Sequence, residues 1–213
     1  MNRGLVEQLL ATLPSSLPLM FNPWRECCDF DSEINTPDTK RLRLSHHLDC
    51  DPVLILIGEA AGYQGCRYSG IPFTSERLLL EGVIPRVPKP VGRLTNRARP
   101  FSEPSATIVW KTLYQLGIAD KTILWNAIPL HPFKANSIWS NRTPSDAEIA
   151  HGVKALRLLR MTFPMAKIVA VGQKAAGILQ SQAIRFEAAV RHPANGGASL
   201  FADGLTGIAQ TLL

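Results

Sequence analysis

The apolar residues of this chain gather into runs whose length and spacing predict alternating strands and helices. Residues 53–57 (VLILI) are apolar at every position, a pattern typical of a strand buried on both faces of a parallel sheet. Three further short apolar runs, at 122–125, 167–171 and 186–190, indicate strands of the same kind. We expect the first strand to stop at Gly58, where a glycine-punctuated loop begins.

Between these runs, apolar residues recur every three to four positions, which predicts amphipathic helices. The expected helices cover residues 2–13, 76–80, 107–116, 145–163, 172–179 and 200–213. One of them begins with a clear signal, because Ser145 is followed three residues later by Glu148, as in a capping box. Residues 14–50 are polar and interrupted by proline, so we expect them to be irregular.

The order of these elements predicts an α/β fold. Strands that alternate with helices build a parallel sheet with helices on both faces and right-handed crossovers. A chain of 213 residues is long enough for one large core, and it contains no internal repeat. We therefore expect a single domain over residues 1–213.

The net charge of +6 and the pI of about 9.4 favour an anionic partner such as nucleic acid. The basic residues are dense in residues 82–104, where five basic residues and five prolines stand against one acid. Such a segment is either a solvated surface loop or an arm that contacts phosphates. In the second case Arg93, Arg97 and Arg99 would bind DNA.

The remaining composition favours a cytoplasmic protein without a membrane partner. The start of the chain carries Glu7 and Pro14 where a signal peptide needs an apolar segment, and no run approaches membrane-spanning length. The cysteines show no C-x-x-C spacing and complete no zinc pattern. We expect reduced structural thiols and no cofactor.

Polar groups follow several of the predicted strands. Glu59 and Gly62 come after the first strand, Asn126 after the second and His192 after the last. The carboxyl ends of parallel strands form the edge at which open α/β sheets bind ligands. Each residue alone is common in turns or cores, but together they predict a shared pocket.

The motifs GEAAG, SGIPF, NAIPLHP and RHPAN together resemble the uracil-DNA glycosylase superfamily, over roughly residues 50–200. The resemblance implies a three-layer α/β/α sandwich with a four-stranded parallel sheet. It also implies hydrolysis of the N-glycosidic bond of uracil, or of a related deaminated base, after the base is flipped out of DNA. The expected partner is DNA that contains a damaged base, and we expect the protein to act as a monomer.

The resemblance also assigns roles to residues of this chain. Phe73 would stack on the flipped base, Asn126 would read its edge, and His192 would donate to its carbonyl and stabilise the leaving group. The same resemblance places Gly58, Ala60 and Gly62 in the base pocket, and Ala194, Asn195 and Gly196 in a loop that enters the minor groove.

Within the superfamily, the chain most resembles the branch whose first motif is GEAPG, followed by a G-x-P-F segment, and whose last motif begins His-Pro. It departs from that related branch at several positions. That branch holds an iron–sulfur cluster with four cysteines, some after the asparagine motif, whereas no cysteine follows Cys66 here. Ala60 stands where other branches carry an Asp or Asn base, and no acid lies between residues 62 and 73. Glu59 is the only carboxylate close to the motif. Either Glu59 activates water, or an ordered water attacks without a carboxylate, in which case His192 and Asn126 would supply most of the rate and Glu59 would matter less.

Two other classes of function stay open. A non-catalytic domain of the same fold would bind damaged DNA without cutting the glycosidic bond. Another α/β hydrolase would use the glycine loop to hold a nucleotide phosphate. The absence of G-x-x-x-x-G-K-[ST] and of G-x-G-x-x-G counts against this last class.

Overall fold

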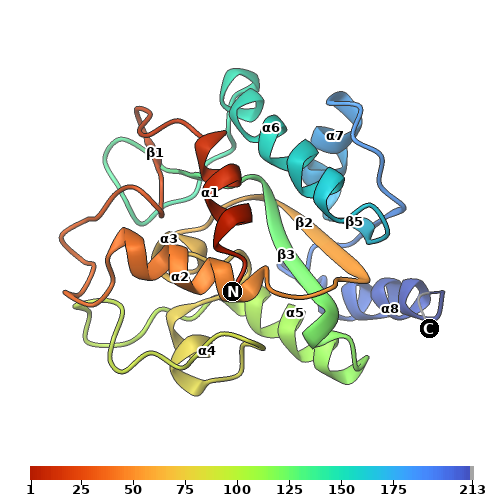
Figure 1. Ribbon diagram of the computed structural model, residues 1–213, viewed down its shortest axis with the longest axis horizontal. Coiled ribbons are helices and arrows are strands. Elements are labelled where there is room, and N and C mark those ends of the chain that lie inside the picture. Colours follow the sequence, from red (N-terminus) through yellow and green to blue (C-terminus); the bar gives the residue numbers. More distant parts are fainter. Residues whose placement is uncertain (212–213) are drawn as a thin grey trace.

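A computed structural model describes residues 1–211 and contains the expected α/β/α sandwich. Its main sheet has four parallel strands in the order β3-β2-β5-β6. Their bounds are Leu54–Ala60 for β2, Thr122–Ile128 for β3, Lys167–Val171 for β5 and Ala188–Val190 for β6. Figure 1 shows helices α6 and α7 on one side of the sheet and α5 and α8 on the other.

The side chains of β2 alternate between two apolar cores. Ile55 and Ile57 face the first core, and Leu54 and Leu56 face the second. Helices α1 (Arg3–Ala11), α6 (Asp146–Thr162) and α7 (Gln173–Ser181) cover the first core. Helices α4 (Glu76–Glu81), α5 (Pro104–Gln115) and α8 (Ala198–Ala209) cover the second. A strand that is apolar at every position is therefore explained by burial on both faces.

Strands β2 and β3 are longer than the apolar runs indicate. The expected stop at Gly58 is wrong, because Gly58 pairs with Asn126 and Ala60 pairs with Ile128 inside the parallel ladder. Backbone hydrogen bonds to neighbouring strands carry β2 through residues that have no strand preference of their own. Asn126 consequently lies within a strand and not after it.

The expectation that residues 14–50 are irregular is also wrong, because helix α2 spans Pro37–His47. Thr36 caps this helix by accepting a hydrogen bond from the Thr39 N–H (3.3 Å). Its buried face is largely polar, so the apolar pattern did not reveal it. Lys40, which is fully buried, forms an ion pair with Asp31 at 2.8 Å.

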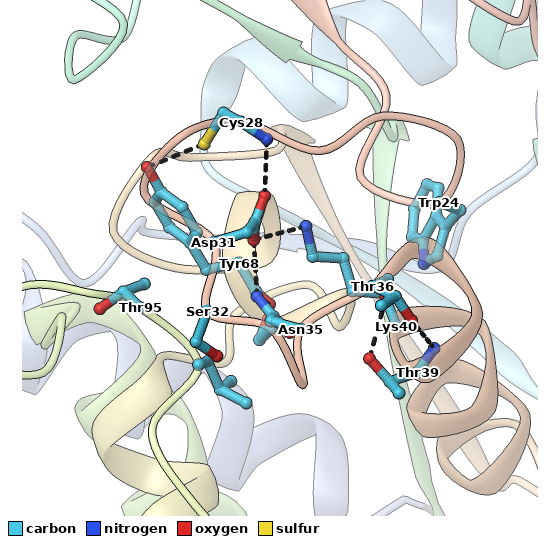
Figure 2. A network of polar contacts seen from close by, with 12 residues as sticks. Trp24, Cys28, Asp31, Ser32, Asn35, Thr36, Thr39, Lys40, Tyr68 and Thr95 are labelled. Atoms are coloured by element: carbon cyan, nitrogen blue, oxygen red, sulfur yellow. Dashed lines mark hydrogen bonds and ion pairs between the residues drawn. The ribbon is translucent and has the colours of Figure 1, made fainter.

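Figure 2 shows this ion pair within a network of polar contacts. Asp31 also accepts hydrogen bonds from Asn35 (2.7 Å) and from the Cys28 N–H (2.9 Å). Asn35 in turn donates to the carbonyl of Tyr68 (3.0 Å) in helix α3, which spans Cys66–Ser69. The network ties the segment before α2 to the loop that follows β2.

The remaining elements are short. β1 (Met20–Phe21) pairs antiparallel with β4 (His131–Pro132), and a 3-10 turn (Ala119–Lys121) precedes β3. The capping box at the start of α6 is present, with Ser145 and Glu148 bonded to each other's backbone N–H. No helix within residues 1–211 is both long and apolar enough to cross a membrane.

The order of the strands places a crevice between β2 and β5. The connection that leaves β2 runs through α5 to β3, whereas the connection that leaves β5 runs through α7 on the other face to β6. Where the connections of two adjacent strands leave in opposite directions, they leave a crevice outside the carboxyl ends of those strands. This crevice is where open α/β sheets bind ligands.

Candidate active site

A cavity of about 600 Å³ opens at this crevice. Its walls come from the loop after β2, from β3, from the start of α7 and from the segment after β6. The residues expected at the site that line it are Glu59, Ala60, Gly62, Phe73, Asn126, His192, Ala194 and Asn195. Segments more than a hundred residues apart in the sequence therefore meet around one space.

Gly58 forms the point at which two of these side chains meet. A Cβ added to Gly58 would lie 2.6 Å from Oδ1 of Asn126 and 2.6 Å from Cζ of Phe73. No side chain fits there without displacing both groups. Gly58 does not itself line the cavity, and its contribution is to let the ring and the carboxamide approach the backbone of β2.

Phe73 adopts an uncommon backbone conformation, with φ of 49°. The next residue, Thr74, accepts a hydrogen bond at Oγ1 from Nε1 of Trp110 in α5 (3.1 Å), which links this segment to the helix. The ring of Phe73 lies 6.4 Å from the ring of His192, centroid to centroid. Strain of this kind is typical of functional sites, and here it presents an aromatic ring to the cavity.

The carboxamide of Asn126 is buried yet borders the cavity. Within the described residues it makes no hydrogen bond to the protein, so its donor and its acceptor are both available to a ligand.

His192 is oriented by its own loop. The Ala194 N–H donates to Nδ1 of His192 (3.1 Å), so in the neutral ring the proton lies on Nε2. Burial, and secondarily the charge of Arg191, lowers the pKa of His192 below its ordinary value. The side chain is therefore a neutral donor at physiological pH. Gly172 (φ 90°) makes room for it, because a Cβ there would lie 3.1 Å from Cβ of His192.

The loop after His192 is a tight turn that carries Asn195 and Gly196 at positive φ (53° and 75°). The Gly197 N–H donates to the carbonyl of Ala194 (3.1 Å), which closes the turn. Asn195 and Gly196 are exposed at its tip, and Leu200, in the first turn of α8, is 60% exposed.

Glu59 also lines the cavity, but it has a cationic neighbour. Nζ of Lys174 lies 3.4 Å from Oε1 of Glu59 and donates to Oγ1 of Thr143 (2.7 Å). This ion pair is partly exposed to solvent, so it contributes little to the stability of the fold.

The basic loop of residues 82–104 contributes none of its arginines or its lysine to the cavity walls. Arg93 donates to Glu76 (2.7 Å) and to the carbonyl of Arg97 (3.2 Å). The guanidinium of Arg97 stacks on Phe101, 3.9 Å from the ring centroid. Arg99 is exposed. Within this loop, Arg93 serves the structure, whereas Arg99 faces solvent.

The sequence alone did not indicate the role of Glu103, which contributes a second carboxylate to the cavity. It is the one acid of the basic segment, and it lies 44 positions after Glu59 in the chain. Its charge in a segment of the opposite sign was the only available signal. Other polar residues of the wall that lie outside the motifs are Gln64, Ser105, Asn141, Arg142, Gln173 and Lys174.

Among residues 1–211, no three His, Cys, Asp or Glu side chains gather into a group that would hold a metal ion. The expectation of a protein without an iron–sulfur cluster stays a prediction, which iron analysis of the purified protein would test.

Comparison with known proteins adds two findings. The family described as the uracil DNA glycosylase superfamily matches residues 46–202. The crystal structure of wild-type SMUG2 from Pedobacter heparinus is similar, with a TM-score of 0.67 and 19% identity over 99% of this chain and 97% of that one. At this identity the likeness shows the fold alone. No curated protein matches the sequence.

Proposed function

Because the chain belongs to the uracil DNA glycosylase superfamily, a family of DNA glycosylases, we propose that it excises uracil or a related deaminated base from DNA. The observation that carries this proposal is the meeting of Phe73, Asn126 and His192 around one cavity. An aromatic face, a free carboxamide and a neutral imidazole donor are what a pocket for a flipped base requires.

Recognition of the base follows from the chemistry of the first two groups. Phe73 offers a stacking surface worth about 1–3 kcal/mol per base, without preference for one base. Asn126 offers a donor and an acceptor side by side, which match the carbonyl and the imide N–H of uracil. A flipped carboxamide would instead match cytosine, so preference for uracil requires neighbouring groups that fix the orientation of the amide.

Catalysis depends on how the leaving group is stabilised. Breaking the glycosidic bond leaves negative charge on the departing base and positive charge on the sugar. The Nε2–H of His192 would stabilise that negative charge as it develops, and one such donor is commonly worth about 3–4 kcal/mol. The neutral state of the ring matters less than the direction of this donor, which the Ala194 N–H sets.

The turn at Ala194–Gly196 would enter the minor groove and fill the space that the flipped base leaves. Leu200 follows this turn in the sequence, in the first turn of α8. It supplies an exposed apolar side chain, of the kind that proteins insert between base steps. The basic loop, through Arg97 and Arg99, would contact phosphates.

The test is single-turnover excision on oligonucleotides that contain uracil, hypoxanthine or xanthine. We expect His192→Ala and Asn126→Ala each to slow excision of the preferred base by about a hundredfold or more. Glu59→Gln should cost clearly less, because Lys174 already partners that carboxylate. Single turnover is required, since slow release of the abasic product would mask the chemical step.

The outcomes separate this proposal from its alternative. Wild-type protein that retards damaged DNA in a gel without producing abasic sites would be a lesion-binding domain. If all three variants excise like wild type, the base pocket is elsewhere.

A further inference from the structure

The water that attacks the sugar must lose a proton, and residues 61–73, which follow β2, hold no carboxylate. Of the two carboxylates in the cavity, Glu59 faces the cation Lys174. Building on the proposed glycosylase function, we propose that Glu103 is the residue that activates water. It reaches the cavity from the start of α5 and replaces an acid that the loop after β2 lacks.

The position of Glu103 supports this role. It is the residue immediately before α5, and its carboxylate turns back onto the loop after β2. A Cβ added to Gly65 would lie 1.9 Å from Oε2 of Glu103 and 3.3 Å from the carbonyl oxygen of Thr74. The carboxylate therefore lies against the loop that follows the first motif, close to the backbone of the residue after Phe73.

Glu103 differs from the other well-buried carboxylates of this protein in its partners. Asp31 and Glu76 each pair with a cation, Lys40 and Arg93 respectively. Among the described residues, Glu103 has no cation within ion-pair distance, and its side-chain partner is the hydroxyl of Ser105, which donates to Oε1 at 3.2 Å. A carboxylate without a cation in a partly desolvated site costs stability, which points to a functional reason for its presence.

The surroundings also suit a base that works near neutral pH. Burial raises the pKa of Glu103 to about 7, and the Ser105 hydroxyl opposes this only partly. The thiol of Cys66 approaches it from α3 and is itself neutral, because burial raises its pKa first and the Glu103 charge raises it further. The charged or titratable groups on the other cavity walls are Glu59, Arg142, Lys174, Arg191 and His192. A base whose pKa lies near the working pH combines the reactive form with adequate basicity.

In the proposed hydrolysis, one proton passes from water to Glu103. The bond between C1′ of the sugar and the ring nitrogen of the base breaks, and its electron pair leaves with the base. A water oxygen bonds to C1′ while the Glu103 carboxylate takes one of the water protons. The base leaves as an anion, held by Nε2–H of His192, and the proton on Glu103 returns to solvent or to the base. The products are an abasic sugar and the free base.

The experiment is single-turnover excision of uracil from pH 5.5 to 9 by wild-type protein and by Glu103→Gln. For wild type we expect the rate to rise tenfold per pH unit up to about pH 7 and then to level off. Glu103→Gln should lose the rise near pH 7 and fall about a hundredfold on the plateau, while it still binds uracil-containing DNA. Glu103→Asp, which keeps a carboxylate, should retain a pH-dependent rise.

Two variants made in parallel serve as controls. Glu187→Gln removes a charge at an exposed position and should behave as wild type. Glu59→Gln tests the competing carboxylate. The inference is overturned if Glu103→Gln keeps the wild-type rate and pH profile, or if Glu59→Gln loses the rise instead. If wild-type protein excises no base at any pH, the proposed function itself fails, and the inference fails with it.

Discussion

At the scale of single residues, Glu103 shows how one carboxylate affects stability and activity in opposite directions. Its pKa is raised by burial to about 7, from an ordinary value of 4.5. Between these two pH values the folded protein keeps a proton that the unfolded chain releases. Stability from this group is therefore full below about pH 4.5 and is lost as the pH rises through 7.

We predict that Glu103→Gln is more stable than wild type above pH 7, by up to about 3 kcal/mol. Glutamine keeps the shape of the side chain and does not ionise, so the cost of a buried charge disappears. The measurement is the free energy of unfolding in urea at pH 5.5 and pH 8 for both proteins. An advantage of the variant that does not grow between these pH values would contradict the raised pKa.

At the scale of elements, a single buried acid binds residues 93–101 of the basic loop. Glu76 of α4 is fully buried and accepts hydrogen bonds from Arg93, from the Leu94 N–H (2.9 Å) and from the Phe101 N–H (3.0 Å). These bonds lower the pKa of Glu76 below its ordinary value in spite of burial, which opposes them. This part of the loop is therefore anchored along its length.

We predict that Arg93 and Arg99 respond differently to replacement. Arg93→Ala should destabilise the protein by about 1–2 kcal/mol, because it leaves a buried carboxylate short of its cation while the remaining donors still hold it. Arg99→Ala should leave stability within about 0.5 kcal/mol and lower the salt dependence of DNA binding by about one phosphate contact. Urea unfolding and the slope of binding against salt concentration measure the two effects. An unchanged slope for Arg99→Ala would make the loop an ordinary surface.

At the scale of the whole molecule, two buried histidines tie stability to pH. His47 accepts a hydrogen bond from the Leu124 N–H of β3 (2.9 Å), and burial, followed by the charge of Arg86, lowers its pKa to about 3. His131 bridges Arg67 and the carbonyl of Ser140 (both 2.9 Å), and burial with the Arg67 charge lowers its pKa to about 4. Both are neutral in the folded protein and join the sheet to the segments around it.

We predict that the protein loses stability as the pH falls from 6.5 to 4. In this window the unfolded chain binds protons on these histidines and the folded protein does not, at a cost of about 3 kcal/mol for each. The two losses together exceed the opposite contribution of Glu103, which stabilises the fold as the pH falls from 7 to 4.5. Urea unfolding at pH 7.5, 6 and 5 measures the loss. His151→Gln, which changes a half-buried histidine of α6 that belongs to neither apolar core, should show the same dependence as wild type. If the urea concentration at the midpoint of unfolding does not decrease between pH 7.5 and pH 5, the two histidines are not held in a buried neutral state.

The sequence by itself determined the elements whose signals are local. Apolar runs, the capping box at Ser145 and turn residues depend on neighbours along the chain, and the parallel sheet with helices on both faces followed from the alternation of strands with helices. The motif residues Phe73, Asn126 and His192 could likewise be selected from the chain alone, because each motif is a short contiguous segment.

Only the tertiary structure decided features whose partners are distant. Strand β2 continues past Gly58 because β3 pairs with it, and α2 buries Lys40 because Asp31 neutralises that charge. Arg93 supports Glu76, and Glu103 reaches the cavity because α5 begins beside Gly65. Pairing, burial and charge compensation join residues that are far apart in the chain, and a linear pattern holds no record of which residues the fold brings together.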